Sequence, residues 1–235
     1  DKLILPGFCS KLFDGTAVES IETEKFDTSR VSDMSYMFGS CDQLTSLDLS
    51  GFDTSNVRNM CGMFTADSGL TSLDVSSFNT SKVMDMSYLF AGCSRLTNLD
   101  LSGFDTSNVN TMDYMFAYST RLTSLDLSGF DTGNVNWMRF MFLNCTGLTS
   151  LDLSSFDTSK VNASDAMFGN DEALQAINLS KNFFKGNIYN FTFPYLDDLT
   201  WTQQSNPSNQ KTWRDMVNSW SEEDAGWWIQ ESEQA

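Results

Sequence analysis

The sequence has 235 residues, of which 40% are hydrophobic, and it carries a formal net charge of −17 without a single histidine. The lack of histidine excludes the usual Ser/His/Asp and Cys/His catalytic arrangements and removes the commonest metal ligand. The excess of acidic residues argues against a nucleic-acid partner, and no apolar run reaches the roughly 18 to 20 residues that a membrane span requires.

The first 25 residues are predicted to form an N-terminal capping partial repeat. Val18 and Ile21 stand 26 positions before Leu44 and Leu47, so a regular spacing begins before the first clear repeat. The ends of a stacked repeat protein differ from its middle because a bare terminal repeat would expose the core.

Residues 26–181 consist of six repeats of 26 residues without an insertion. Each repeat begins with a phenylalanine, and a valine, a second phenylalanine and a leucine recur at fixed later positions. The starting residues are Phe26, Phe52, Phe78, Phe104, Phe130 and Phe156. A spacing kept this strictly predicts that equivalent residues of successive repeats form columns in a stack.

The segment Leu44-x-x-Leu47-x-Leu49 matches the core pattern of leucine-rich repeats. Alternation of these leucines with polar residues predicts a short strand with one buried face. The segments 46–50, 72–76, 98–102, 124–128 and 150–154 are predicted to form one continuous parallel sheet.

On the return side of each repeat, Met60, Met63 and Phe64 are predicted to point inward, in helical or 3₁₀ turns. The Asp-Thr-Ser-Asn segment at 53–56 contains turn formers whose side chains can bond nearby backbone. The predicted fold class is therefore a leucine-rich-repeat solenoid. It would have a parallel β-sheet on one face, short strands and helical or 3₁₀ turns on the other, and caps at both ends.

Residues 182–235 leave the period and are predicted to form a C-terminal cap that is rich in tryptophan. The tryptophans are Trp201, Trp213, Trp220, Trp227 and Trp228. They are interpreted as plugging the end of the core, and an aromatic ligand site is the alternative. Residues 205–212 are predicted to form an exposed loop within the cap.

Together, the segments Phe-Asp-Thr-Ser-x-Val, Met-Ser-Tyr-Met-Phe and Cys-x-x-Leu-Thr-Ser-Leu-Asp-Leu-Ser resemble BspA-like leucine-rich-repeat surface proteins, in the variant found in lactobacilli and mycoplasmas. The resemblance covers roughly residues 8–181. It implies a bacterial surface location and an adhesive role toward host matrix proteins or other cells, and it brings no catalytic residues. The sequence departs from the pattern at Asp67, Ser119 and Asp171, where the family often has cysteine.

Three of the five cysteines, Cys41, Cys93 and Cys145, share one column in alternate repeats. Residues two repeats apart should lie about 9.6 Å apart, beyond the roughly 7 Å limit on the Cα separation of a disulfide. We expect small buried thiols, with disulfides between columns as the alternative. No converging ligand set is present in the sequence, so neither a metal nor a cofactor is predicted.

An aromatic column lies between inward-pointing methionines, and outward projection would make it a binding stripe for sugars or an apolar protein patch. Partial burial against neighbouring repeats is the alternative. The candidate ligand-binding residues are Tyr36, Tyr88, Tyr114 and Phe140 of this column, and Trp137, which introduces an aromatic into another column.

An aspartate column occupies the outward position between the two strand leucines. Its members are Asp48, Asp74, Asp100, Asp126 and Asp152. Repulsion between neighbouring charges is predicted to raise their pKa values in the folded state. The row is a candidate electrostatic seat for a basic partner or divalent cations, and a solvated acidic face that keeps the protein soluble is the alternative.

These features predict a non-catalytic adhesion or interaction module on the bacterial cell surface, outside the cell. Its partner would be a host matrix protein, a glycan or another cell-surface protein. A passive rigid stalk within a larger surface protein is the alternative, because the outward strand positions read Ser-Asp-Ser almost throughout and a spacer needs no varied surface.

Overall fold

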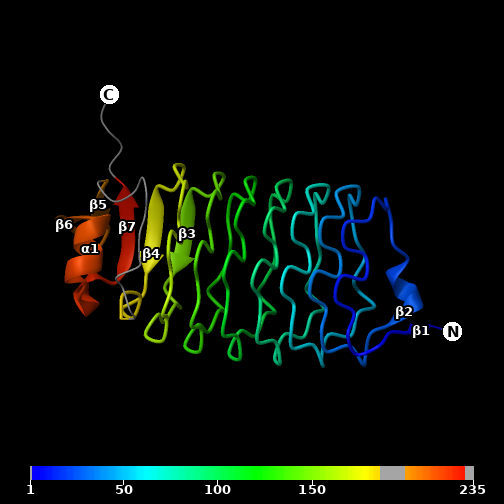
Figure 1. The fold of residues 1–235 in the computed structure, drawn as a ribbon. Coiled ribbons are helices and arrows are strands. Elements are labelled where there is room, and N and C mark those ends of the chain that lie inside the picture. The colour runs from blue at the N-terminus through cyan, green and yellow to red at the C-terminus, as the bar shows by residue number, and fades with distance from the viewer. Residues whose placement is uncertain (1, 186–198, 231–235) are drawn as a thin grey trace.

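The computed structural model describes residues 2–185 and 199–230, and the repeats lie side by side in sequence order along its long axis (Figure 1). Turns and unpaired extended segments make up most of each repeat. The repeats are numbered one to six from Phe26, Phe52, Phe78, Phe104, Phe130 and Phe156.

Regular elements gather at the two ends of the described chain. Near the N-terminus, β1 (Leu3–Ile4) pairs in parallel with β2 (Phe26–Asp27), which follows the short 3₁₀ helix η1 (Thr23–Lys25). The later strands are β3 (Ser150–Leu153), β4 (Ala176–Leu179), β5 (Thr200–Gln203), β6 (Asn206–Thr212) and β7 (Gly226–Gln230). Between β6 and β7 lie α1 (Trp213–Ser219) and the 3₁₀ helix η3 (Glu222–Asp224).

The predicted leucine-rich-repeat solenoid with one continuous parallel sheet is wrong. The large sheet has five strands in the order β3-β4-β7-β5-β6, and it is mixed, because β3 and β4 are parallel whereas β7 runs antiparallel to both β4 and β5. In the described residues, the leucine segments pair as strands only where β3 meets β4, and α1 is the one α-helix.

Local hydrogen bonds recur on the leucine side in both the unpaired and the paired leucine segments. The Asp48 carboxylate accepts the backbone N–H of Ser50 at 2.9 Å, and Asp74, Asp100 and Asp126 repeat the contact with the serine two residues on. Short polar side chains that bond nearby backbone in this way compete with sheet pairing. Asp152 makes the same bond to Ser154 although β3 pairs with β4, so this competition does not by itself prevent pairing.

Backbone hydrogen bonds between repeats form instead on the methionine side. The N–H groups of Met34, Tyr36 and Phe38 donate to carbonyl oxygens 25 residues later, at 2.9, 2.8 and 3.0 Å. A chain of parallel bridges runs through the same side, joining Phe8, Asp33, Asn59, Asp85, Thr111, Trp137 and Ala163 in that order. The helical or 3₁₀ turns predicted for this side are wrong, because its hydrogen-bonded turns, such as that from the Met37 N–H to the Met34 carbonyl oxygen at 3.1 Å, contain left-handed residues such as Tyr36.

A column of buried threonines makes a second connection. The Thr106 hydroxyl donates to the carbonyl oxygen of Asp131 at 2.8 Å and accepts the Asp131 N–H at 2.8 Å. The same pair of bonds occurs from Thr28, Thr54, Thr80 and Thr132. The threonine of the Asp-Thr-Ser motif thus forms hydrogen bonds to the next repeat, in addition to the turn that the residue types of the motif predict.

Phenylalanines stack along the interior from repeat to repeat. The rings of Phe38, Phe64, Phe90, Phe116, Phe142 and Phe168 have successive centroids 5.5–5.9 Å apart and nearly parallel planes. All five cysteines are free thiols; four are buried, as predicted, and Cys61 is half-buried. These columns confirm which residues of each repeat form the core.

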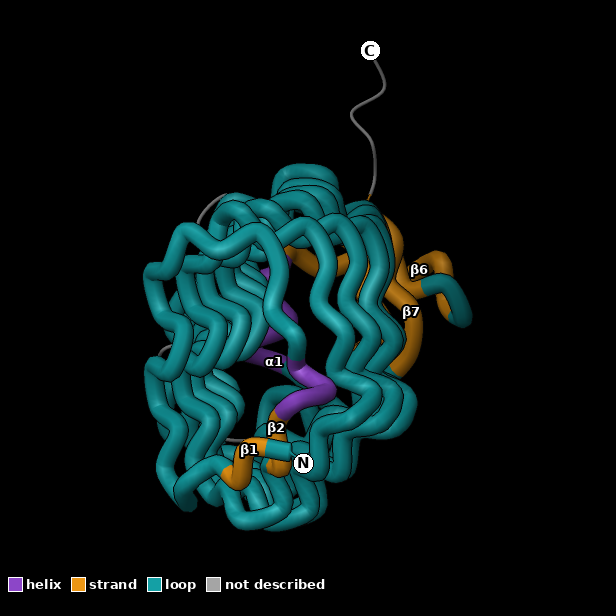
Figure 2. The backbone as a smooth tube through the Cα atoms, turned by 90° about the vertical axis from the view of Figure 1, so that its right-hand side faces the viewer, coloured by secondary structure: helices purple, strands orange, loops and turns teal. Residues whose placement is uncertain are grey.

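Tryptophans close the C-terminal end of this phenylalanine stack. Trp201, Trp213 and Trp228 are fully buried, and Trp213 meets the Phe168 ring edge-on at 5.9 Å. Viewed along the row of repeats, α1 lies within their outline (Figure 2). The burial agrees with the packing interpretation, although residues 186–198 and 231–235 of the predicted cap lie outside the described residues.

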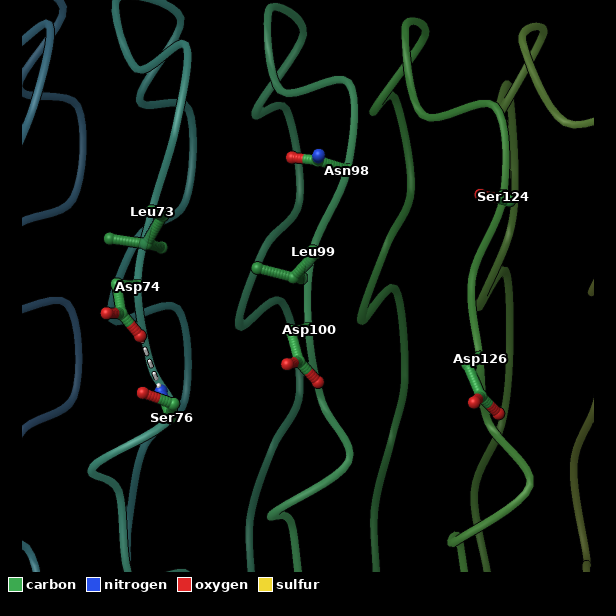
Figure 3. Close-up of a pocket in the computed structure, with 8 residues that line it drawn as sticks. All are labelled: Leu73, Asp74, Ser76, Asn98, Leu99, Asp100, Ser124 and Asp126. Carbon is green, nitrogen blue, oxygen red and sulfur yellow. Dashed lines mark hydrogen bonds between the residues drawn. The ribbon is translucent and has the colours of Figure 1, made fainter.

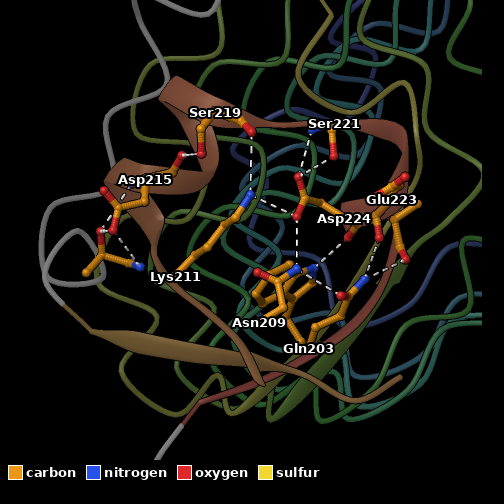
Figure 4. A network of polar contacts seen from close by, with 11 residues as sticks. Gln203, Asn209, Lys211, Asp215, Ser219, Ser221, Glu223 and Asp224 are labelled. Carbon is orange, nitrogen blue, oxygen red and sulfur yellow. Dashed lines mark hydrogen bonds and ion pairs between the residues drawn. The ribbon is translucent and has the colours of Figure 1, made fainter. Parts of the chain in front are cut away.

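A polar network holds the C-terminal segment together (Figure 4). Asp224 is buried and accepts hydrogen bonds from Ser221 and Asn209, and Lys211 lies 2.8 Å from its carboxylate. Burial favours a higher pKa of Asp224, but these hydrogen bonds outweigh it and hold the pKa below its ordinary value. Lys211 belongs to β6. Residues 205–208 and 210 are exposed, as predicted, but the predicted loop at 205–212 is wrong, because most of this segment is a strand. Within the described ranges, no helix has the length and apolar character needed to cross a membrane.

We predict that Thr106→Val lowers the free energy of unfolding by about 1–3 kcal/mol, because it removes a buried hydroxyl and leaves the N–H and carbonyl of Asp131 without their partner. Urea denaturation provides the measurement. Thr45→Val is the matched control, since Thr45 is exposed, and its effect should stay within about 0.5 kcal/mol. Equal losses in both variants would contradict a structural role for the threonine column.

Candidate functional site

The aromatic column occupies a left-handed turn in each repeat. The φ angles of Tyr36, Tyr88, Tyr114 and Phe140 are 54°, 59°, 58° and 57°. A left-handed conformation costs a residue with a side chain about 1–2 kcal/mol. The methionines before these residues are fully buried whereas the aromatics remain partly exposed. The turn thus holds large side chains at the surface against a local backbone preference.

Three of these aromatics form a stack on the methionine side. The ring centroids of Tyr88 and Tyr114 lie 4.7 Å apart with an interplanar angle of 8°, and those of Tyr114 and Phe140 lie 4.6 Å apart at 23°. Each pair contributes about 0.5–1.5 kcal/mol beyond burial, which offsets part of the cost of the turn. Because neighbouring rings cover each other's faces, the stack presents ring edges to its surroundings.

The tyrosine hydroxyls of the stack remain protonated well above neutral pH. Burial, followed by nearby charges such as that of Asp113, raises the pKa values of Tyr88 and Tyr114 above the ordinary value. A protonated hydroxyl both donates and accepts a hydrogen bond. The stack therefore combines apolar ring edges with neutral polar groups.

Tyr36 lies apart from this stack because repeat two has Gly62 in the aromatic column. The Tyr36 ring occupies the space above this glycine, where a Cβ would come within 2.4 Å of Tyr36 Cε1. The Cys61 thiol donates to the Tyr36 hydroxyl at 3.6 Å, and Lys11 Nζ lies 5.4 Å from the ring centroid. The structure therefore does not bring all the predicted aromatic residues together.

Trp137 adds an exposed ring to the same side. It belongs to the chain of parallel bridges, between Thr111 and Ala163, and 44% of its surface is exposed. Tyr118, which follows Tyr114 by four residues and is also left-handed, is 48% exposed. Tyr88, Tyr114, Phe140 and Trp137 are called the aromatic row below.

The sequence reading did not identify an ion pair that crosses the aromatic row. Asp113 accepts the backbone N–H of Arg139 at 2.7 Å and its Nε–H at 2.9 Å. Asp113 is buried while 45% of the Arg139 side chain is exposed, and the pairing raises the pKa of the guanidinium. A signal was present, because the two residues are 26 positions apart and have opposite charges.

Paired amides extend the same side in repeats five and six. Asn162 donates to the side-chain oxygen of Asn136 at 3.3 Å, and Asn170 donates to that of Asn144 at 3.1 Å. The methionine side thus carries paired amides in repeats five and six in addition to the aromatic row, with Arg139 held in place by Asp113. Such a surface can contact apolar groups and hydrogen-bond to neutral polar ones.

The aspartate column lies on the leucine side and lines an open hollow. Asp74, Asp100 and Asp126 surround a volume of about 580 Å³ together with Leu73, Ser76, Asn98, Leu99 and Ser124 (Figure 3). Asp48 and Asp152 extend the column beyond this hollow, and Asp152 accepts the Asn178 amide at 3.0 Å. The predicted acidic row therefore exists as a surface of side chains without the continuous sheet beneath it.

The prediction of raised pKa values in this row is wrong. Hydrogen bonds from the serine two residues on lower the pKa values of Asp48, Asp74, Asp100 and Asp126. Repulsion from Asp74 and Asp126 does act on Asp100, but it is weaker than these hydrogen bonds. The local turn therefore favours the ionised form of these four aspartates.

Comparison with known families assigns this repeat. Residues 8–98 and 68–182 match the family described as "Mycoplasma protein of unknown function, DUF285". The chain belongs to the DUF285 family. The two matches together contain the aromatic row and the aspartate column, and they stop at the start of the tryptophan-rich segment.

Solved structures similar to this DUF285 chain are distant. A leucine-rich-repeat protein from Bacteroides ovatus is 16% identical, with a TM-score of 0.40, over 76% of this chain and 55% of that one. The functional domain of InlJ from Listeria monocytogenes, described as including a cysteine ladder, is 16% identical, with a TM-score of 0.20, over 71% of this chain and 47% of that one. The chain thus spans about half the length of each. No curated protein matches it.

We predict that acid weakens the DUF285 chain through its aspartate column. A pKa lowered by folding gives stability that is present above the unfolded value of about 3.9 and is lost as pH falls through the folded value. Asp100→Asn combined with Asp126→Asn keeps an oxygen for the serine N–H and removes the titration. The fall in melting temperature between about pH 5 and pH 2.5 should be smaller in the double variant. An equal fall in both proteins would show that the serine hydrogen bonds do not stabilise the carboxylates.

Proposed function

We propose that this DUF285 chain is a non-catalytic interaction module on the outside of a bacterial cell, of the BspA-like kind that its repeat motifs resemble. It would bind a host matrix protein, a glycan or another cell-surface protein. The observation that carries the proposal is the aromatic row, in which Tyr88, Tyr114 and Phe140 are held at the surface by a strained turn in successive repeats and Trp137 adds an exposed ring on the same side.

Backbone strain at Tyr88, Tyr114 and Phe140 supports a binding role for the aromatic row. Gly62 and Ala166 show that the left-handed turn forms with a small residue, so the fold itself does not require a large ring there. Strained positions that persist are concentrated at binding sites. Aromatic side chains together with arginine are also the residues that contribute most to binding energy at protein interfaces. Arg139 beside Trp137 therefore adds to the support for binding on this side.

A passive spacer is the second candidate, and the leucine side favours it. The outward residues around Asp48, Asp74 and Asp126 are serines in each case, so this side offers nearly the same chemistry at every step. A surface that recognises one partner needs different side chains at adjacent positions. The two candidates therefore make opposite claims about the methionine side, where the side chains differ from repeat to repeat.

We predict that Trp137→Ala weakens binding to the partner by about 2 kcal/mol or more, roughly thirtyfold in Kd, because it removes the most exposed ring of the row. Tyr88→Asn combined with Tyr114→Asn should weaken binding too, and asparagine tolerates the left-handed turn. The measurement is binding of the purified chain to immobilised matrix proteins and to a glycan array, with each variant checked for an unchanged melting temperature.

Phe8→Ala is the matched control, because Phe8 stands in the same bridge column as Trp137 at the opposite end of the chain and is 77% exposed. It should bind as the wild type does. Absence of binding to every ligand by the wild type would favour the spacer. Equal binding by the wild type and the aromatic-row variants would place the interaction on another surface.

A further inference from the structure

One buried column contains aspartates in two repeats where the other repeats have a thiol or a hydroxyl group. Its members are Cys41, Asp67, Cys93, Ser119, Cys145 and Asp171, one in each repeat. All six are buried. In this position the thiols and the hydroxyl act as hydrogen-bond donors, whereas an ionised aspartate can only accept.

The donors of this column share one kind of acceptor. The thiol of Cys93 donates to the carbonyl oxygen of Phe64 at 3.1 Å, and the hydroxyl of Ser119 donates to that of Phe90 at 2.8 Å, in each case 29 residues earlier. Cys145 and Cys41 make the same type of bond to Phe116 and Phe13. For Asp67, the carbonyl oxygen 29 residues earlier is that of Phe38.

Around Asp67, two buried acceptors face a shortage of donors. Asp67 is 0% exposed; its Oδ1 accepts the Cys41 N–H at 2.7 Å, but its Oδ2 has no hydrogen-bond partner. Phe38 is fully buried as well, and among the residues that the structure describes no group donates to its carbonyl oxygen. Leaving a buried acceptor unpaired costs about 1–3 kcal/mol, and more if it is charged.

We propose that Asp67 is held as a neutral carboxylic acid whose Oδ2 proton is donated to the carbonyl oxygen of Phe38, so that the joint between repeats one and two is sensitive to pH. One proton would satisfy both acceptors at once. It would make Asp67 equivalent to the thiol and hydroxyl donors in the other repeats, while Oδ1 keeps the Cys41 N–H.

The groups that act on Asp67 favour the neutral form. Burial raises the pKa of Asp67 to about 7 and outweighs the lowering effect of the Cys41 hydrogen bond, and the negative charges of Asp42 and Asp14 raise it further. The remaining neighbours in the column are the thiols of Cys41 and Cys93, whose own pKa values are raised by burial. Every group named here therefore disfavours a carboxylate at this place, except the Cys41 N–H.

The direction of the pH effect follows from the raised value. Between the unfolded pKa of about 3.9 and the folded one of about 7, the native chain keeps a proton that the unfolded chain has lost. The stabilisation is complete below this window and is lost as pH rises through it. The unfolding constant should therefore increase by up to about tenfold per pH unit in the window and level off above it.

Asp171 occupies the same column and must be separated from Asp67. Burial raises the pKa of Asp171 to about 8, although its Oδ1 accepts the Cys145 N–H at 2.7 Å. The tests are therefore made in an Asp171→Asn background. Asp67→Asn then mimics the neutral acid at every pH, because its oxygen can accept from Cys41 and its N–H can donate to Phe38.

The first test measures urea unfolding of the Asp171→Asn chain, with and without Asp67→Asn, from about pH 4.5 to pH 8. The slope of the logarithm of the unfolding constant against pH should be smaller by about one with asparagine at position 67. Hydrogen exchange of the Cys41 amide, corrected for its intrinsic pH dependence, should become faster above about pH 7 only when Asp67 is present. Equal slopes in the two proteins would overturn the proposal.

The second test needs no substitution at Asp67. Infrared difference spectra of the folded Asp171→Asn chain between about pH 6 and pH 8.5 should contain the carbonyl stretch of one protonated carboxyl group. Asp67→Ser, which places the Ser119 donor type in this position, should abolish the band and remain folded. Absence of the band in the Asp171→Asn chain would show that Asp67 does not change its protonation between about pH 6 and pH 8.5, and would overturn the proposal that this joint is sensitive to pH.

Discussion

Backbone hydrogen bonds on the methionine side connect each repeat to the next, and the arrangement of the other columns depends on them. The bonds from Met34, Tyr36 and Phe38 recur at the same positions in later repeats, so the repeats are joined at the spacing of parallel strands. A single inserted residue would shift every donor away from its acceptor. This requirement explains why the 26-residue period contains no insertion between residues 26 and 181.

The spacing between stacked rings differs between the surface and the core. The surface rings of Tyr88 and Tyr114 lie directly on the hydrogen-bonded side, and their centroid separation of 4.7 Å is close to the spacing of paired strands, about 4.8 Å. The interior phenylalanines lie further from it and are 5.5–5.9 Å apart. The aromatic row is thus closely stacked because the backbone beneath it is hydrogen-bonded, and this supplies the rigidity that a binding surface needs.

The columns could be predicted from the sequence, but the side that carries the hydrogen bonds could not. Burial of Met34 and Phe38 follows from apolar periodicity alone. The Leu47-Asp48-Leu49 segment has the alternation of a strand but stays unpaired, whereas the equivalent Leu151-Asp152-Leu153 segment pairs within β3. Periodicity identifies the face of a residue, but the same alternation occurs in paired and unpaired segments, so it does not reveal which backbone groups pair.

Some features of the candidate site could also be predicted from the sequence, and others could not. The place of the tyrosines between methionines left both outward projection and partial burial open, and the structure shows them partly exposed. Removal of Tyr36 from the stack depends on Gly62, and the position of Arg139 depends on a contact with Asp113 in the preceding repeat. Such contacts lie between equivalent residues of neighbouring repeats, so they become visible only when the sequence is compared along columns.

A strict repeat also makes its own exceptions interpretable, because each unusual residue can be compared with its equivalents in the same molecule. The Cys93 and Ser119 side chains define what the position of Asp67 requires, namely a small buried donor directed at a carbonyl oxygen. Aspartate has the right size and only lacks the proton. Repeat two combines this exception with Gly62 in the aromatic column, and repeat six combines Asp171 with Ala166, so the joints that these two repeats make with the repeats before them differ from the others at the surface and in the core. The chemistry of these columns therefore places a response to pH at these two joints, and the first of them also contains the unpaired Oδ2 of Asp67.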